Sequence, residues 1–430
     1  MHRSLTPSET TTEGLVERAQ DTTAPEGLVF YHANEGRPLA TPWQVAALRA
    51  GMVGRHRLPE GWVLDCACGS GIQLAAYATA LQRPVLGVEL AEERAKASAV
   101  NVRSLVEHSR ASDEDWYRSS RIISGDGTDA VGVLKSLDEP WTTVAFLHLD
   151  PARPRNSRTH ALEEMQPPLH RVLAAWAPHF TPSDAGPAVL LDLSPRLTTA
   201  QRMEVEAIVD ETWPGIARTW EWTSRGRGRV DRLALWLGGV ADPDATRRFI
   251  RVPPSMADRP VILRSTTLAT ELEERHHPPK RNEHVSILDA ALLESGLMAD
   301  WLARVAPNDE GRWATLEGRR PQLHHERPLQ LQSGDQRLVQ ATGRVVELLS
   351  FTLDETTVDR LVTVALDHRL SSVKLRFDLD PALQPKLQGS LDRQLKRRHG
   401  DRVGFVARHP HGEVLLLCVS PNPSDEPAVI

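Results

Sequence analysis

The chain has 430 residues, which predicts two or three domains, and its apolar and charged fractions of 40% and 25% are those of a globular protein. No apolar run approaches the ~20 residues that a membrane span requires, so an integral membrane protein, a collagen-like fibre and a wholly disordered chain are excluded. The net charge of −6 argues against coating nucleic acid by bulk electrostatics, so a polyanion must be met by local clusters of basic residues.

Three cysteines cannot build a disulfide framework. Cys66 and Cys68 form a C-x-C pair with no second pair for zinc, so we expect reduced thiols, no disulfide partner and no metal site. Residues 1–27 are rich in Thr, Ser and Glu without periodicity, which predicts a flexible N-terminal tail. This opening has no apolar stretch typical of a secretory signal, so we expect a cytoplasmic protein.

The next element is a helix that begins near Thr41, which can cap it, with Pro42 at its first position. Short apolar runs then alternate with longer amphipathic segments. Strands are predicted at 62–65, 84–90, 121–125, 143–150 and 188–194, with helices near 71–82, 91–108, 128–137 and 161–177. This order predicts a parallel sheet covered on both faces. Two further strands, 216–222 and 230–239, flank a glycine-containing turn that suits a hairpin.

Domain boundaries follow from these patterns. The sheet region is expected to form one domain over residues 28–250, and the Pro- and His-rich segment 251–342 is predicted to be a linker and connecting segment. From 343 to 422 the order strand, helix, strand, helix, hairpin predicts a small α+β domain.

The most informative segment is VLDCACGSGIQ, in which a strand ends at Asp65 and a helix follows a turn containing Gly69 and Gly71. Glycines let a cofactor approach the backbone closely, and the N-terminus of the helix offers free N–H groups. Dinucleotide-binding proteins have a third glycine near position 74, where this chain has Leu74, so the pattern does not favour a nicotinamide cofactor.

Acidic residues follow three more strands. Glu89 ends the second strand and could accept two hydrogen bonds from ribose hydroxyls, Asp126 follows the third and suits an adenine amine, and Asp150 ends the fourth. Ligands of open parallel sheets bind outside the carboxyl ends of the strands. We therefore expect Asp65, Glu89, Asp126 and Asp150 to converge on one crevice.

These motifs resemble class I S-adenosylmethionine-dependent methyltransferases, and the run Asp65-Cys66-Ala67-Cys68-Gly69-Ser70-Gly71 is similar to the cofactor turn of many RNA methyltransferases. More specifically, ATPWQVA, Asp-Pro-Ala-Arg after the fourth strand, the apolar LALWLGG and the tail resemble prokaryotic methyltransferases with a C-terminal THUMP-like domain. The resemblance implies an α/β Rossmann-like sheet of seven strands, the last antiparallel, followed by a THUMP-like α+β domain.

The resemblance also implies site roles. S-adenosyl-L-methionine would lie over Gly69 and Gly71, near Cys66, with Asp65 anchoring the turn or the amino group. Glu89 would bind ribose, and Asp126 with Gly127 would meet adenine. These are the cofactor-binding residues that we predict from the sequence.

The segment Asp150-Pro151-Ala152-Arg153 corresponds to the loop that holds the acceptor amine in enzymes that methylate exocyclic amines. There the carboxylate and the following carbonyl accept the hydrogens of the amine and aim its lone pair at the methyl group. Arg153 replaces the aromatic residue of that loop, so it would stack on a base, pair with phosphate or serve a structural ion pair.

Arginines indicate the substrate class. Two clusters, Arg155 with Arg158 after the fourth strand and Arg225, Arg227 and Arg229 in the hairpin, would flank the crevice and capture phosphates. We therefore expect methylation of a base nitrogen in structured RNA, either tRNA or rRNA. The alternatives are a cofactor-binding RNA-binding or scaffold protein with little catalysis, and a methyltransferase that acts on a small molecule or a protein. The sequence does not predict the oligomeric state.

Overall fold

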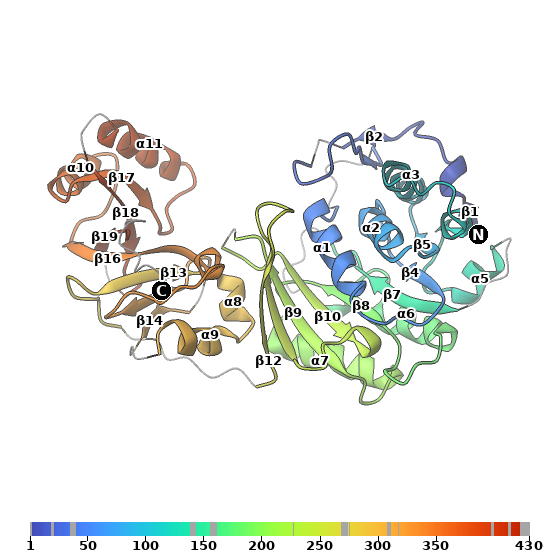
Figure 1. Cartoon of the computed structure of the whole chain (residues 1–430). Coiled ribbons are helices and arrows are strands. Elements are labelled where there is room, and N and C mark those ends of the chain that lie inside the picture. The colour runs from blue at the N-terminus through green and yellow to red at the C-terminus, as the bar shows by residue number, and fades with distance from the viewer. Residues whose placement is uncertain are drawn as a thin grey trace. The chain divides into compact units, whose positions relative to one another are not determined.

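The computed structural model describes residues 2–18, 21–34, 40–137, 143–154, 161–226, 228–267, 274, 276–307, 311–316, 318–396, 400–411 and 414–421. These residues divide into two compact units. The first unit comprises Met1–Glu221, Arg232–Thr246 and Val252–Arg259, and the second comprises Trp222–Asp231, Arg247–Arg251 and Pro260–Ile430. Figure 1 shows both units, with elements labelled where there is room.

The first unit is built on a mostly parallel sheet in the order β6-β5-β4-β7-β8-β10-β9. Its strands are β4 (Trp62–Asp65), β5 (Val85–Glu89), β6 (Arg121–Ser124), β7 (Val144–Leu149), β8 (Val189–Leu193), β9 (Arg218–Ser224) and β10 (Arg232–Leu237). The pairs from β6 through β8 are parallel, whereas β10 pairs antiparallel with β8. The mostly parallel sheet and its antiparallel β10 agree with the prediction, but the predicted count of seven strands is too low, because β1 (Arg3–Leu5) also pairs with β6.

Helices cover both faces of this sheet. They are α1 (Trp43–Val53), α2 (Ile72–Leu81), α3 (Glu92–His108), α4 (Asp115–Ser119), α5 (Ala130–Lys135), α6 (Leu169–Trp176) and α7 (Thr199–Thr212). Figure 1 shows α2 and α3 on one face and α6 and α7 on the other. The strands between them are buried along their whole length, as their continuous apolar sequences require. Thr41 does not cap α1, because Pro42 is the N-cap residue and the helix begins at Trp43.

The N-terminal segment is not the flexible tail that its composition predicts for residues 1–27. Strand β1 (Arg3–Leu5) pairs antiparallel with β6, and β2 (Val16–Glu17) pairs with β3 (Tyr31–His32). An edge strand such as β6 leaves a row of backbone groups unpaired, and β1 satisfies them. Two or three residues are too few to show a strand periodicity, so the sequence gives no signal for these strands.

The second unit contains a seven-stranded sheet in the order β14-β15-β13-β16-β19-β18-β17 and the antiparallel pair β11 and β12. Its strands are β11 (Arg247–Arg251), β12 (Val261–Ser265), β13 (His284–Leu288), β14 (Arg312–Thr315), β15 (Gln322–His325), β16 (Val339–Leu349), β17 (Leu370–Leu375), β18 (Arg402–Arg408) and β19 (Leu415–Val419). Its helices are α8 (Ala290–Glu294), α9 (Met298–Val305), α10 (Val358–Asp367) and α11 (Leu383–Leu395).

The order of elements predicted for 343–422 is present from β16 to β19, but the proposed linker over 251–342 is wrong. The described residues of that segment include four complete strands and two α-helices, and its strand β13 pairs with β16 in the interior of the sheet. Proline- and histidine-rich loops separate its short strands, which is why the composition resembles that of a linker. None of the described helices is both long and apolar enough to cross a membrane.

Candidate functional site

The four acidic residues predicted to converge lie at one edge of the first unit's sheet. Asp65 and Glu89 are the last residues of β4 and β5, Asp126 follows β6, and Asp150 follows β7. These strands are parallel neighbours, so their carboxyl ends meet at the same edge. Asp65 aligns with His148, two residues before Asp150. The sheet therefore brings together the backbone positions that the sequence singled out.

The turn after β4 is shaped by its two glycines, which have φ angles of +53° at Gly69 and +71° at Gly71. Only glycine adopts this left-handed region without strain. A Cβ atom on Gly71 would lie 2.7 Å from Cα of Ser98, whereas a Cβ on Gly69 would meet no atom within 4 Å. The turn is thus packed tightly against α3 at Gly71 and open at Gly69.

Two polar side chains support this turn. Asp65 Oδ1 accepts a hydrogen bond from the N–H of Ala67 (3.1 Å), so Asp65 anchors the turn, one of the two roles expected for it. Buried Asn101 of α3 donates to the carbonyl of Ser70 (2.7 Å), and its Oδ1 accepts from the N–H of Tyr31 (2.7 Å). Asn101 therefore joins the turn to the N-terminal segment, a role that no sequence signal indicated.

Glu89 contacts the turn with a buried side chain. Its Oε2 accepts one hydrogen bond, from the N–H of Gly69 at 3.1 Å. Its Oε1 accepts from the N–H of Ala91 (3.0 Å) and from Nε of Arg94 (2.9 Å). The next residue, Leu90, is 76% exposed. A carboxylate oxygen with spare acceptor capacity beside an open glycine and an exposed apolar side chain suits a ribose with a flat base next to it.

Asp126 and Gly127 form the third part of this edge. Oδ1 of exposed Asp126 accepts from the N–H (2.9 Å) and hydroxyl (2.8 Å) of Thr128, which fixes the turn after β6. A Cβ on Gly127 would collide with the carbonyl oxygen of Cys66, and the Gly127 carbonyl accepts from Nε1 of Trp176 (2.8 Å). Gly127 is thus needed to pack this turn against the glycine turn.

The cysteines are structural. Cys66, Cys68 and Cys418 are buried and free. Burial raises the pKa of each thiol well above its usual value, so none of the three is a nucleophile at neutral pH. Among the described residues no group of three or more His, Cys, Asp or Glu is placed to hold a metal ion.

Asp150, the expected acceptor residue, has a side chain that is 35% exposed and lies 3.8 Å from the Arg232 guanidinium of β10. Arg232 also donates to the hydroxyl of Thr41 (3.2 Å), so the residue expected to cap α1 instead helps to place this arginine. Burial raises the pKa of the Asp150 carboxyl, and Arg232 opposes that shift. The carboxylate is therefore held beside a cation but retains an exposed face.

The residues after Asp150 differ in their surroundings. Pro151 is buried, and Ala152 forms a two-way backbone pair with Gln166 (2.8 and 2.9 Å), which ties the loop down. Arg153 is partly buried, and its Nε and Nη2 find no hydrogen-bond partner among the described residues. Burial lowers the pKa of this guanidinium despite nearby Asp150. An unsatisfied buried donor is uncommon in folded proteins, and a substrate acceptor atom would satisfy it.

The structure also shows a buried chain of charged side chains that sequence reasoning missed. His148 of β7 hydrogen-bonds Asp65 through Nδ1 (2.7 Å) and Asp192 of β8 through Nε2 (3.3 Å), and Asp192 forms an ion pair with Arg49 of α1. The side chains of all four residues are only 2% exposed. A charged or polar residue inside an otherwise apolar strand, as in FLHLD and VLLDLS, was the available signal.

The predicted substrate-binding arginines are only partly described. Arg155, Arg158 and Arg227 lie outside the described residues. Arg225 pairs through two nitrogens with Oδ1 of Asp231 (3.2 and 3.0 Å), which braces the turn after β9. Arg229 is exposed. Of the hairpin arginines that are described, Arg229 is thus the one offered to solvent.

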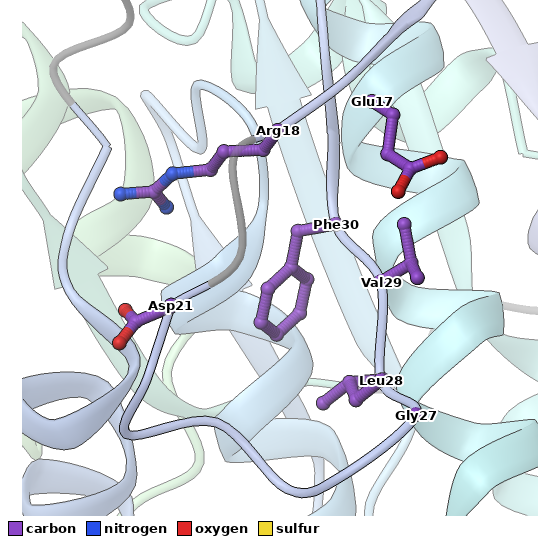
Figure 2. A pocket seen from close by; sticks show the side chains of 7 residues that line it. All are labelled: Glu17, Arg18, Asp21, Gly27, Leu28, Val29 and Phe30. Carbon is purple, nitrogen blue, oxygen red and sulfur yellow. The ribbon is translucent and has the colours of Figure 1, made fainter.

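A separate hollow of about 250 Å³ lies in the N-terminal segment, lined by Glu17, Arg18, Asp21, Gly27, Leu28, Val29 and Phe30. Figure 2 shows Arg18 and Asp21 on one side of the Phe30 ring, with Glu17 pointing away from them. None of the residues predicted to bind cofactor or acceptor lines this hollow, so it is not the expected crevice.

Comparison with known proteins adds evidence on the fold. No family model matches the chain, and no curated protein does either. The chain is similar to a "putative methyltransferase" from Porphyromonas gingivalis W83, with a TM-score of 0.55 and 15% identity over 89% of this chain and 81% of that one. Since the identity is low, this likeness shows a shared fold and does not establish an activity.

Two other solved structures match over smaller parts of the chain. A 16S rRNA methyltransferase of T. thermophilus, solved with AdoMet and guanosine, has a TM-score of 0.33 and 16% identity over 52% of this chain and 50% of that one. A "putative methyltransferase" from Streptococcus mutans, solved with SAH, has a TM-score of 0.29 and 8% identity over 44% of this chain and 95% of that one.

Proposed function

We propose that this chain is an S-adenosylmethionine-dependent methyltransferase that methylates a base nitrogen in structured RNA, tRNA or rRNA. The observation that carries the proposal is the contact between the glycine turn and the second acid. Oε2 of Glu89 accepts a hydrogen bond from the N–H of Gly69, and no atom lies within 4 Å of the position that a Cβ on Gly69 would take. This combination fits a nucleoside that approaches the backbone and presents ribose hydroxyls to a carboxylate.

The residues at the edge fit the parts of the cofactor. Glu89 would bind the ribose, exposed Leu90 would pack on the adenine, and Asp126 with Gly127 would border the base. Asp65 and Asn101 would keep the turn in its left-handed shape. Bound S-adenosylmethionine supplies a methyl group activated by a sulfonium, so the protein's task is to hold and orient the two reactants.

Asp150 would orient the acceptor. Its carboxylate would accept a hydrogen bond from an exocyclic amine and so aim the nitrogen lone pair at the methyl carbon. The cofactor would supply the methyl group and take up the electron pair of its carbon–sulfur bond as the amine nitrogen bonds to the methyl carbon, and Asp150 would pass the surplus proton of the amine to solvent. Arg153 would satisfy its unpaired Nε and Nη2 on a substrate carbonyl or phosphate oxygen.

Glu89→Ala tests the cofactor site. We expect S-adenosylmethionine binding to weaken by roughly 10- to 100-fold in calorimetry, because hydrogen bonds to a charged group are each worth about 1.5–3 kcal/mol. Glu93→Ala, which removes an exposed carboxylate from the same helix region, is the matched control and should bind as the wild type does. Unchanged affinity in Glu89→Ala would contradict the ribose role.

Asp150→Asn tests the transfer step. Transfer of a tritiated methyl group to total RNA from cells that lack this gene should fall roughly 100-fold or more, while cofactor affinity stays within a few-fold. Asp184→Asn, on an exposed loop, is the control. Cofactor binding without transfer in the wild type would favour the scaffold alternative, for which the unpaired Arg153 in place of an aromatic residue is the supporting observation. Transfer to metabolites or proteins alone would favour the third function.

A further inference from the structure

The buried charged chain beside the proposed transfer site has a geometry that determines its protonation. His148 Nδ1 lies 2.7 Å from Asp65 Oδ2, and His148 Nε2 lies 3.3 Å from Asp192 Oδ2. Ionised carboxylates only accept hydrogen bonds, so each ring nitrogen of His148 must donate. A histidine that donates from both nitrogens is an imidazolium. His148 is therefore a buried cation held between two buried anions.

The electrostatic surroundings agree with this assignment. Burial alone would lower the pKa of His148, but Asp65 and Asp192 outweigh it and raise the pKa to about 10. Burial alone would raise the pKa of Asp192, yet Arg49 and His148 hold it below its usual value. The two partners thus shift in opposite directions, as an ion pair requires.

This chain links the cofactor turn to the acceptor residue. Asp65, His148 and Asp192 come from the adjacent strands β4, β7 and β8, and Asp150 directly follows β7, two residues after His148. Both His148 and Asp192 contribute to the electrostatic field at Asp150. The other described titratable or charged groups that interact with this cluster are Arg49 of α1, the thiols of Cys66 and Cys68 after β4, Tyr77 of α2, Arg153 after β7, Glu221 of β9 and Arg232 of β10.

Fold stability alone does not account for such a cluster. Burying two or more charges costs a desolvation free energy that their attraction repays only partly, and apolar side chains of similar volume often stabilise a fold as well or better. The neighbouring positions of β7 and β8 are apolar and fully buried, so the sheet has no packing need for charge here. The cluster adjoins Asp150 and the turn anchored by Asp65, which is where fixed charges would serve transfer.

We propose that His148 is a positioning residue, an imidazolium that holds the carboxylates of Asp65 and Asp192 in place and, together with Asp192, acts electrostatically on Asp150, which lies two residues further along the chain. The role of Asp150 in this inference rests on the proposed function, but the protonation states of His148 and Asp150 can be measured without cofactor or RNA. His148 would favour the ionised form of Asp150, which accepts the amine hydrogen, whereas Asp192 would disfavour it. The two members of one hydrogen bond should therefore act on Asp150 in opposite directions.

Two isosteric variants separate this role from a merely structural one. In His148→Gln the cation is lost, so the pKa of Asp150 should rise by roughly one pH unit. In Asp192→Asn an anion is lost, so the pKa of Asp150 should fall by a similar amount. The titration is read by ¹³C NMR of the full-length protein labelled at the aspartate carboxyl carbons, with the Asp150 signal assigned by its absence in Asp150→Asn. His170→Gln and Asp184→Asn, both exposed, are the controls.

A measurement on the unaltered protein covers the case in which a variant does not fold. With ¹⁵N-labelled histidine, and the His148 signals assigned in His148→Gln or by through-space contact with Tyr77, both ring nitrogens should show imidazolium shifts up to about pH 9. A neutral His148 at pH 8, no movement of the Asp150 titration, or movement in the same direction in both variants would overturn the inference. None of these readouts needs cofactor or RNA, whereas failure to bind S-adenosylmethionine would overturn the proposed function instead.

Discussion

The two glycines of the turn after β4, Gly69 and Gly71, should respond differently to the same substitution. Alanine at either position adopts a left-handed backbone conformation, which costs roughly 1–2 kcal/mol. At Gly69 that is the whole cost, because the added methyl group meets no atom within 4 Å. At Gly71 the methyl group also lies 2.7 Å from Cα of Ser98, and overpacking of this kind costs roughly 1–3 kcal/mol more.

Stability and affinity should therefore separate. Gly71→Ala should lower the free energy of unfolding by roughly 2–5 kcal/mol and Gly69→Ala by roughly 1–2 kcal/mol. For a unit of this size each kcal/mol corresponds to about 2–4 °C in Tm. Gly69→Ala should in addition lose at least roughly 10-fold in S-adenosylmethionine affinity, because its methyl group fills the space in which the cofactor would approach the backbone.

Chemical unfolding and calorimetry on the two variants test these values. Gly51→Ala, at an exposed position of α1, is the control, because it adds a methyl group to a helix without strain and should raise stability by up to about 1 kcal/mol with unchanged affinity. Wild-type affinity in a folded Gly69→Ala protein would place the cofactor elsewhere and refute the cofactor site. Equal stability of Gly69→Ala and Gly71→Ala would refute the packing argument at Ser98.

Three further predictions concern charged side chains. Half-exposed Arg94 forms an ion pair with Oε1 of Glu89 that is worth about 0.2–1 kcal/mol, and the ribose would compete with it for this oxygen. Arg94→Ala should therefore tighten S-adenosylmethionine binding by roughly 1.5- to 5-fold in calorimetry. Weaker binding would instead make Arg94 a cofactor ligand. Arg229→Ala should reduce the slope of log K for RNA binding against log salt concentration by about 1. Arg225→Ala should mainly lower the stability of the fold, because the Arg225 guanidinium is paired with Asp231. An unchanged slope in Arg229→Ala would show that Arg229 does not contact RNA. The His148 imidazolium stabilises the fold fully below pH 6.5 and progressively less as the pH rises towards about 10. In urea unfolding between pH 7 and 9, the free energy of unfolding of the wild type should therefore fall by up to about 1.4 kcal/mol per pH unit more than that of His148→Gln. Parallel pH profiles of the two proteins would show that His148 is not charged.

Local patterns were sufficient to predict the sheet and the positions of its four acids. Gly69, Gly71 and the carboxylates that end β4 and β5 are set by neighbours in the chain, and parallel pairing brings strand ends together without further information. The N-terminal strands and β12 to β15 were missed for the opposite reason. Each is only two to five residues long and exists because a distant strand offers it hydrogen bonds, as β6 does for β1.

Side-chain partners were predicted less well than backbone positions. Arg225 belongs to a basic cluster in the sequence, yet its partner is Asp231 six residues away across a turn. Arg94 covers Glu89 through a rotamer choice that no periodicity encodes. His148 and Asp192 were visible as polar residues inside apolar strands, but their significance depends on the lateral alignment of β4, β7 and β8, which only the pairing of the strands supplies.

The proposed methyl transfer needs accurate placement of two reactants more than a strong acid or base, and the open turn and the buried charges would both meet that requirement. A carboxylate can orient a ribose or an amine only if its oxygens keep a fixed position. At this edge Asp65 is fixed by two hydrogen bonds, from the N–H of Ala67 and from Nδ1 of His148. An exposed carboxylate would keep its hydration and rotate freely. Burial with fixed counter-charges costs stability but leaves Asp65 one orientation, and the same field acts on half-exposed Asp150. The desolvation cost of this network is thus the physical argument for the proposed role of this edge in methyl transfer.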